Sequence, residues 1–144
     1  YVGRNDCCFT TKSMQQILLR KGRIKSIPDF INKIAIPYFQ NNSYYEINGK
    51  YKNGEYDHGI IGTFQSYQDI LGVTDLKVVV ELLKKRLRNI KLGKNNLCYC
   101  GSGKKVKDCH LHKYNDLKYI DDKTIDDDLK RFFNWLKEAS EAKK

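Results

Sequence analysis

Four metal-ligating side chains fall within thirteen consecutive positions of this chain. They follow the pattern Cys-x-Cys-x8-Cys-His and are Cys98, Cys100, Cys109 and His110. Thiolate and imidazole groups select zinc over hard cations, and four of them complete a tetrahedral structural site that leaves no position for a substrate. The spacing therefore predicts a zinc knuckle, a small fold that the metal itself organises.

Two glycines and a second histidine belong to the same segment. Gly101 and Gly103 lie between the second and third ligands and allow the backbone to turn tightly there. His112 is two residues beyond His110 and would compete with it for the metal. The alternative interpretation is two ordinary buried cysteines beside a surface Cys-His pair, but this density of ligand-type residues favours a metal site.

The run from Leu97 to His110 is close to a known pattern. Its sequence, Cys-x-Cys-Gly-Ser-Gly-Lys-Lys-x-Lys-x-Cys-His, resembles the SEC-C motif, a zinc-binding module named for the C-terminal tail of the SecA translocase. The resemblance covers only about 14 residues but is specific. It implies bound zinc with His110 as the fourth ligand, and a binding role rather than a reaction.

The composition is that of a folded protein. Of its 144 residues, 40% are hydrophobic and 31% are charged, and no apolar run is long enough to cross a bilayer, so we expect no membrane partner. Three of the five cysteines belong to the predicted zinc site, which argues against a disulfide framework and for a reducing cytoplasm. The chain begins with Tyr1, and we expect it to be the C-terminal part of a longer protein.

Apolar residues recur at helical spacing along most of the chain. Ser26 and Pro28 predict a helix start, Gly72 predicts a helix end, and Pro37 predicts a kink or a break within the apolar pattern of residues 30–39. The predicted helices span residues 11–20, 26–45, 60–71, 74–90 and 124–138.

The absence of an alternating strand pattern predicts a mainly α fold. Residues 1–93 would form a helical domain of about four helices, residues 94–114 the zinc knuckle, and residues 115–144 an acidic linker and a C-terminal helix. Ile61 and Ile90 belong to the apolar stripes that we expect in the core.

The formal net charge of +10 is unevenly distributed. Residues 77–107 contain ten lysines and arginines and a single acidic side chain, Glu81. Such a stripe attracts nucleic acid, anionic lipid or an acidic protein face, and a solvated helix face is the equal alternative. The lysines next to the ligands would also offset the thiolate charge. The expected partner-binding residues are Lys84, Lys85, Arg86, Arg88, Lys104, Lys105 and Lys107.

Residues 36–72 carry a second resemblance. Their distinctive runs are Ile-Pro-Tyr-Phe-Gln-Asn-Asn-Ser-Tyr-Tyr-Glu-Ile-Asn-Gly-Lys, then Gly-Glu-Tyr-Asp-His-Gly, then Tyr-Gln-Asp-Ile-Leu-Gly. They resemble the C-terminal half of prokaryotic ubiquitin-conjugating-enzyme-like proteins, several of which end in a SEC-C motif. The resemblance, over about residues 1–110, implies a larger α+β fold whose N-terminal β-sheet would precede Tyr1, a bacterial cytoplasmic location and a role in antiphage defence.

The same family carries a catalytic cysteine in a Leu-Cys-Leu context. Cys8 falls on that position, and Cys7 replaces the first leucine. The resemblance implies that Cys8 accepts an acyl group as a thioester and passes it to an amine. The alternative is a half-buried structural thiol, since free cysteine is among the most buried residue types. We expect His58 to hold its loop in place through hydrogen bonds to local backbone groups rather than to take part in catalysis.

Two functional hypotheses follow. In the first, the chain belongs to a conjugating-enzyme-like transferase in which Cys8 carries the acyl group and the zinc module docks a protein partner, either a ubiquitin-like protein or a conjugation target. In the second, the chain has no catalytic activity and its knuckle and basic stripe bind nucleic acid or an acidic protein. Both predict that a chelator disorders residues 94–114 while the preceding helices persist.

Overall fold

The computed structural model describes residues 9–141 of the chain. Within this range it contains helices, loops and one isolated β-bridge, between Leu97 and Lys105, which confirms the predicted mainly α fold. None of the helices within residues 9–141 is long and apolar enough to cross a membrane. The chain divides into two units, Tyr1–Glu55 and Tyr56–Lys144, and we describe each of them separately.

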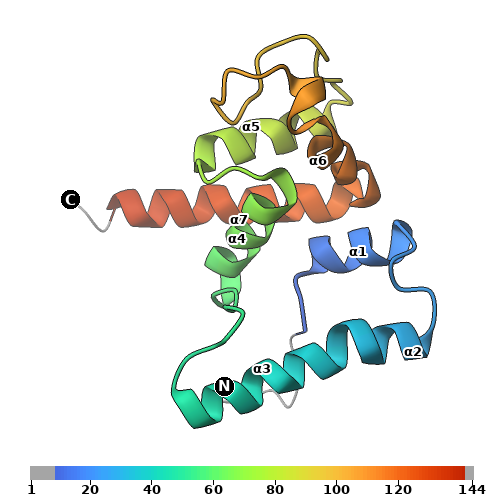
Figure 1. Cartoon of the computed structure of the whole chain (residues 1–144). Coiled ribbons are helices and arrows are strands. Elements are labelled where there is room, and N and C mark those ends of the chain that lie inside the picture. The colour runs from blue at the N-terminus through green and yellow to red at the C-terminus, as the bar shows by residue number, and fades with distance from the viewer. Residues whose placement is uncertain (1–8, 142–144) are drawn as a thin grey trace. The chain divides into compact units, whose positions relative to one another are not determined.

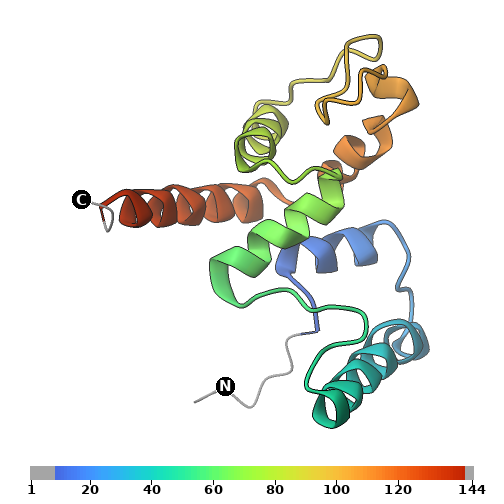
Figure 2. The same ribbon diagram turned by 60° about the vertical axis from the view of Figure 1, so that its left-hand side comes forward.

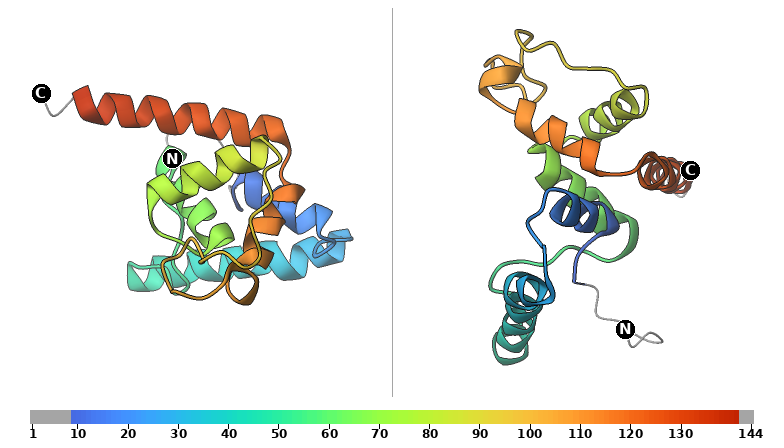
Figure 3. Two further views of the ribbon diagram at one scale, coloured as in Figure 1. Left: turned by 90° about the horizontal axis from the view of Figure 1, so that it is seen from above. Right: turned by 90° about the vertical axis from the view of Figure 1, so that its right-hand side faces the viewer.

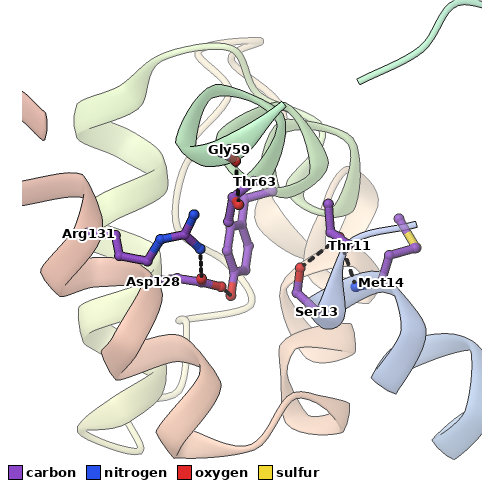
Figure 4. A network of polar contacts seen from close by, with 8 residues as sticks. Thr11, Ser13, Met14, Gly59, Thr63, Asp128 and Arg131 are labelled. Carbon is purple, nitrogen blue, oxygen red and sulfur yellow. Dashed lines mark hydrogen bonds and ion pairs between the residues drawn. The ribbon is translucent and has the colours of Figure 1, made fainter. Parts of the chain in front are cut away.

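The first unit contains three α-helices and a π-helical turn (Figure 1). Side-chain caps start the first two helices, and the start at Ser26 is the one that the sequence predicts. The Thr11 hydroxyl accepts a hydrogen bond from the Met14 amide at 3.3 Å, and the Ser26 hydroxyl accepts one from the Asp29 amide at 3.2 Å (Figure 4 shows the Thr11 cap). The elements are α1 (Lys12–Arg20), α2 (Ile27–Phe30), η1 (Ile31–Ala35) and α3 (Ile36–Asn48).

The kink predicted at Pro37 takes the form of a wider helical turn just before the proline. A proline inside a regular helix removes a donor, and its ring clashes with the carbonyl four residues earlier. Here the π-turn η1 ends at Ala35, and the Ile36 amide bonds to the carbonyl of Ile31, five residues back. Pro37 therefore falls in the first turn of α3, where the missing donor costs nothing.

Aromatic rings organise this unit around Phe9. The Phe9 ring makes edge-to-face contacts with Phe30, Tyr38 and Phe39, at centroid distances of 5.3, 4.8 and 6.1 Å. No residue of α2, η1 or α3 is fully buried. The apolar pattern of these helices therefore leaves a set of aliphatic side chains at the surface, namely Ile27, Ile31, Ile36 and Ile47.

The second unit is built around α4, which contacts the three other α-helices of the unit, and α5 lies alongside α7 (Figures 2 and 3). Aspartates start two of the helices. The Asp75 carboxylate accepts from the Lys77 amide at 2.7 Å, and the Asp121 carboxylate accepts from the Thr124 amide at 2.7 Å. The elements are α4 (Gly59–Leu71), α5 (Leu76–Leu87), η2 (Val106–Asp108), α6 (Leu111–Asp116), η3 (Leu117–Tyr119) and α7 (Asp122–Glu141).

Phe132 of α7 lies in the core of this unit. Its fully buried ring contacts the rings of Phe64 and Tyr67 of α4, at centroid distances of 6.0 and 6.2 Å. The Tyr67 hydroxyl donates to the buried Asp128 carboxylate at 3.0 Å, and Arg131 bonds to the other oxygen of that carboxylate at 3.4 Å (Figure 4). The core thus includes a polar pair whose groups are satisfied within it.

Two residues expected in the core are exposed. Ile61 lies off the buried stripe of α4, which contains Thr63, Ser66 and Tyr67 instead, so its side chain faces outward. The prediction for Ile90 was wrong because α5 ends at Leu87, before the apolar pattern does. Polar residues replace apolar ones on the inner face of α4, which periodicity alone does not reveal.

Gly62 allows the loop before α4 to lie directly on that helix. A Cβ atom at this position would lie 1.6 Å from the Asp57 carbonyl oxygen. Two hydrogen bonds of 2.7 Å hold the loop there. The backbone amide of Asp57 donates to Gln65 Oε1, and Gln65 Nε2 donates to the Asp57 carboxylate. The close approach requires glycine although the backbone is helical.

We expect Gly62→Ala to destabilise the second unit by about 1–3 kcal/mol, because overpacking of a backbone contact outweighs the gain of about 1 kcal/mol in helix propensity. Urea denaturation followed by the fluorescence of Trp135, the single tryptophan, measures this. Gly93→Ala is the control, since the atoms nearest to its Cβ would be those of the exposed Asn96 side chain, which can move. Equal stability of Gly62→Ala and the parent protein would contradict the packing argument.

Candidate metal centre

The structure brings Cys98, Cys100, Cys109 and His110 together, and their ligand atoms all lie within 4.8 Å of one another. The Cys100 and Cys109 sulfurs are 3.6 Å apart, and His110 Nδ1 is 3.5 Å from the Cys98 sulfur and 3.1 Å from the Cys109 sulfur. A tetrahedral zinc ion with ordinary bond lengths separates its ligand atoms by about 3.5–3.8 Å. The donor set therefore fits one metal ion of this kind.

A short paired segment forms the centre. The Cys98 amide donates to the Lys104 carbonyl at 2.8 Å, and the Val106 amide donates to the Asn96 carbonyl at 2.9 Å. Gly101 and Gly103 close the turn with φ angles of 76° and 72°, which a residue with a side chain rarely adopts. The pairing places the first two cysteines opposite Cys109, which follows the short turn η2.

His110 faces the thiolates with one ring nitrogen and α4 with the other. Nδ1 is the atom near the sulfurs. The opposite edge of the ring lies on Gly72, where a Cβ atom would approach Nε2 to 2.7 Å. His112, the competing candidate, is exposed and lies outside the cluster. Of the two histidines, His110 is therefore the one that joins the cysteine cluster, with Nδ1 as its nearest ring nitrogen.

The thiols of the centre differ in acidity. Burial raises the pKa of Cys98, whereas hydrogen bonds from the Ser102 hydroxyl and amide lower the pKa of Cys100 to about 6. Metals bind cysteine as the thiolate, so the buried Cys98 would release a proton when a metal binds. With four protein ligands and no open position, the centre is suited to a structural role.

The predicted partner-binding residues serve different purposes. Lys104, Lys105 and Lys107 are exposed on the metal-binding loop, which extends beyond the ends of α5 and α6 (Figure 2). Arg86 is directed inward instead, since it pairs with Asp122 at 3.1 Å and donates to backbone carbonyls of the segment before α7.

The remaining basic residues lie on α5 and at its end. Lys84 lies 5.1 Å from the centre of the Phe133 ring and 3.9 Å from Glu81. Lys85 is half-buried and Arg88 is exposed. Among the predicted basic residues, the loop lysines and Arg88 are thus the most accessible to a partner.

Cys8, the candidate acyl-carrying residue, lies outside the described residues. Two contributors to the metal centre were not predicted, namely Tyr99 and Gly72. The Tyr99 hydroxyl donates to the carbonyl of Leu71 at 3.0 Å and to that of His110 at 3.2 Å, and burial raises its pKa, so it stays a donor. The position of Tyr99 between two predicted ligands could have drawn attention to it in the sequence. Its hydrogen-bond partner, the Leu71 carbonyl of α4, is known only from the fold.

Comparison with known proteins gives two matches. Residues 95–111 match the family model described as the SEC-C motif. Protein translocase subunit SecA of Pseudomonas fluorescens (strain Pf0-1) is 40% identical over 57 residues, which is 39% of this chain and 6% of SecA. No solved structure matches the chain. The chain therefore contains a SEC-C motif with a Cys3His cluster suited to a metal, whereas the resemblance of residues 1–110 to conjugating-enzyme-like proteins stays a prediction.

Proposed function

We propose that this chain binds one zinc ion through Cys98, Cys100, Cys109 and His110 and uses the metal-ordered loop to dock an acidic protein. One observation carries the proposal: four soft or borderline donor atoms lie within 4.8 Å of one another in the SEC-C segment. Thiolates and imidazole favour zinc over magnesium or calcium. We place the protein in a bacterial cytoplasm, where free thiols remain reduced.

The surface of the loop favours a protein over a nucleic acid. Leu97 is 74% exposed and pairs with Lys105, so an apolar side chain lies among lysines. Aromatic platforms that stack on bases are typical of single-strand binding. Tyr99, the aromatic residue of residues 94–110, is instead engaged with two backbone carbonyls. A partner that offers acidic groups around an apolar contact fits this surface best.

Metal content and charge reversal test the two parts of this proposal. Purified protein should contain one equivalent of zinc by mass spectrometry of the native chain. A fluorescent polyglutamate peptide should bind at low salt, and Lys104→Glu with Lys105→Glu should weaken binding at least about tenfold because both lysines are exposed. Lys50→Glu with Lys52→Glu makes the same change in net charge on exposed residues of the first unit and serves as the control.

Equal losses in the two double variants would show that only net charge matters and would overturn the docking surface. A single-stranded RNA oligonucleotide provides the second comparison. Tighter binding of RNA than of polyglutamate, with a steep salt dependence, would favour the nucleic-acid alternative.

A second candidate function is thioester transfer through Cys8. The aliphatic side chains that α2 and α3 expose, such as Ile27 at 76% and Ile47 at 83%, favour it, because a larger conjugating-enzyme-like domain would cover such a face. Incubation with an activating enzyme and a ubiquitin-like protein should then give a thiol-sensitive adduct. An adduct that persists in Cys8→Ser, or none on a chain extended by the β-sheet that the resemblance predicts, would exclude this function.

A further inference from the structure

The last turn of α4 is capped by the metal-binding segment. The final carbonyl groups of a helix have no partner within the helix. In α4 the Leu71 carbonyl accepts a hydrogen bond from the Tyr99 hydroxyl at 3.0 Å, and the Asp69 carbonyl accepts one from the Lys113 ammonium at 3.0 Å. The two donors lie 28 and 44 residues further along the chain, Tyr99 between Cys98 and Cys100 and Lys113 three residues after His110.

Tyr99 joins this cap to the metal ligands themselves. It lies between Cys98 and Cys100, and its hydroxyl is shared between the Leu71 carbonyl and the His110 carbonyl, 3.2 Å away. Its ring lies 5.6 Å from the His110 ring at an angle of 34°. One side chain thus contacts the end of α4 and the backbone and ring of a ligand residue.

Gly72 completes the contact on the helix side. It ends α4 with a φ of 71°, and a Cβ atom there would lie 2.7 Å from His110 Nε2, 2.8 Å from Cδ2 and 2.9 Å from the Lys113 side chain. The His110 ring therefore packs directly against the backbone of Gly72, where a side chain would clash with it. In this position the Nε2 edge of the ring faces Gly72 and Nδ1 faces the sulfurs.

We propose that Tyr99 is a positioning residue that, with Gly72, holds His110 in its ligating orientation and couples metal occupancy to the end of α4. The proposal rests on the metal-binding function proposed above. Groups that orient a ligand typically contribute 10–100-fold to metal affinity. Coupling is reciprocal, so a metal that orders His110 and Tyr99 also stabilises the α4 cap, and a loosened cap weakens the metal site.

Tyr99→Phe in the full chain tests the proposal, because it removes the shared hydroxyl and keeps the ring. We expect cobalt(II), titrated against a chelator, to bind 10–100-fold more weakly, with an altered thiolate-to-cobalt absorption spectrum. Hydrogen exchange should show metal-dependent protection of the Gly72 and Val73 amides, which bond to the Gln68 carbonyl, and this dependence should shrink in the variant.

Tyr114→Phe is the matched control. Tyr114 is buried and its hydroxyl donates to the Ile90 carbonyl at 2.6 Å, so the same atom is lost without removing a hydrogen bond to Leu71 or His110. The control should lose stability without losing cobalt affinity. Gly72→Ala is the second variant, and it should weaken cobalt binding by displacing the His110 ring.

The outcomes separate the two proposals. If the parent protein does not bind cobalt or zinc, the metal-binding function fails. If the parent protein binds and both Tyr99→Phe and Gly72→Ala bind equally well, with unchanged spectra, the metal site stands and the positioning role is overturned. Equal losses of affinity in Tyr99→Phe and Tyr114→Phe would also overturn it, because the effect would then be general destabilisation.

Discussion

Cys98→Ser should abolish stoichiometric zinc binding and unfold the loop that carries the centre. Cys98 is the buried cysteine of the proposed ligand set, and serine keeps its shape while removing the thiolate. Structural zinc contributes about 10–16 kcal/mol in small zinc-finger peptides, which is comparable to the roughly 5–15 kcal/mol that stabilises a whole domain. Apart from Cys98 and Val106, the segment 94–108 has no buried side chain, so packing cannot replace the metal.

The measurement is the zinc content of the purified protein together with hydrogen exchange over residues 94–114. Amides of this segment should exchange freely in Cys98→Ser and in the chelated parent protein. Helices α4 and α5 should persist, with weaker protection at the last turn of α4. Cys8→Ser makes the same atomic change at a cysteine outside the predicted ligand set and should retain its zinc. Full zinc content in Cys98→Ser would refute the ligand assignment.

Phe132→Ala should cost about 3–5 kcal/mol and lower the Tm of the second unit by more than about 10 °C. The ring is fully buried and lies between α7 and α4, where Phe64 and Tyr67 surround it. Removing it leaves a cavity that rigid neighbouring helices cannot close. The lost ring also borders the buried hydrogen bond between Tyr67 and Asp128, which water would then reach more easily.

Phe133→Ala is the control for this variant. Phe133 is the next residue of α7, and it is 45% exposed with the Lys84 ammonium over its ring. Its loss should cost less than about 1 kcal/mol, in line with other surface substitutions. Thermal unfolding followed by Trp135 fluorescence compares the two variants, since this tryptophan lies on the same helix. Equal effects of the two substitutions would show that α7 does not pack as described.

The helices were largely predictable because their signals are local. Capping residues such as Thr11 and Ser26, together with the helical period of apolar residues, indicate where a helix begins and which face it buries. The period failed at Ile61 and Ile90, where the choice of buried face and the end of the helix depend on neighbouring elements. Position 62 also depends on a neighbouring element, because the loop before α4 lies so close to the helix there that only glycine fits.

The clustering of the three cysteines and His110 was predictable because the four residues are close in sequence and match a metal-binding pattern. Which basic residues are exposed and which form internal ion pairs was not predictable, since Lys104 and Arg86 carry the same charge. Only the fold shows that Lys104 is exposed on the loop and that Arg86 pairs with Asp122, 36 positions further along the chain. Charge is a property of a residue, but accessibility is a property of its surroundings.

The sequence by itself determined the donor set, the mainly helical class and the turn at Gly101 and Gly103, because these depend on side-chain chemistry and on contacts within a few residues. The tertiary structure alone decided that the metal loop caps α4. Tyr99, His110 and Gly72 meet through contacts that span tens of residues, and such contacts depend on how helices pack. No local pattern in the chain encodes the match between a hydroxyl and an unpaired carbonyl at a distant helix end.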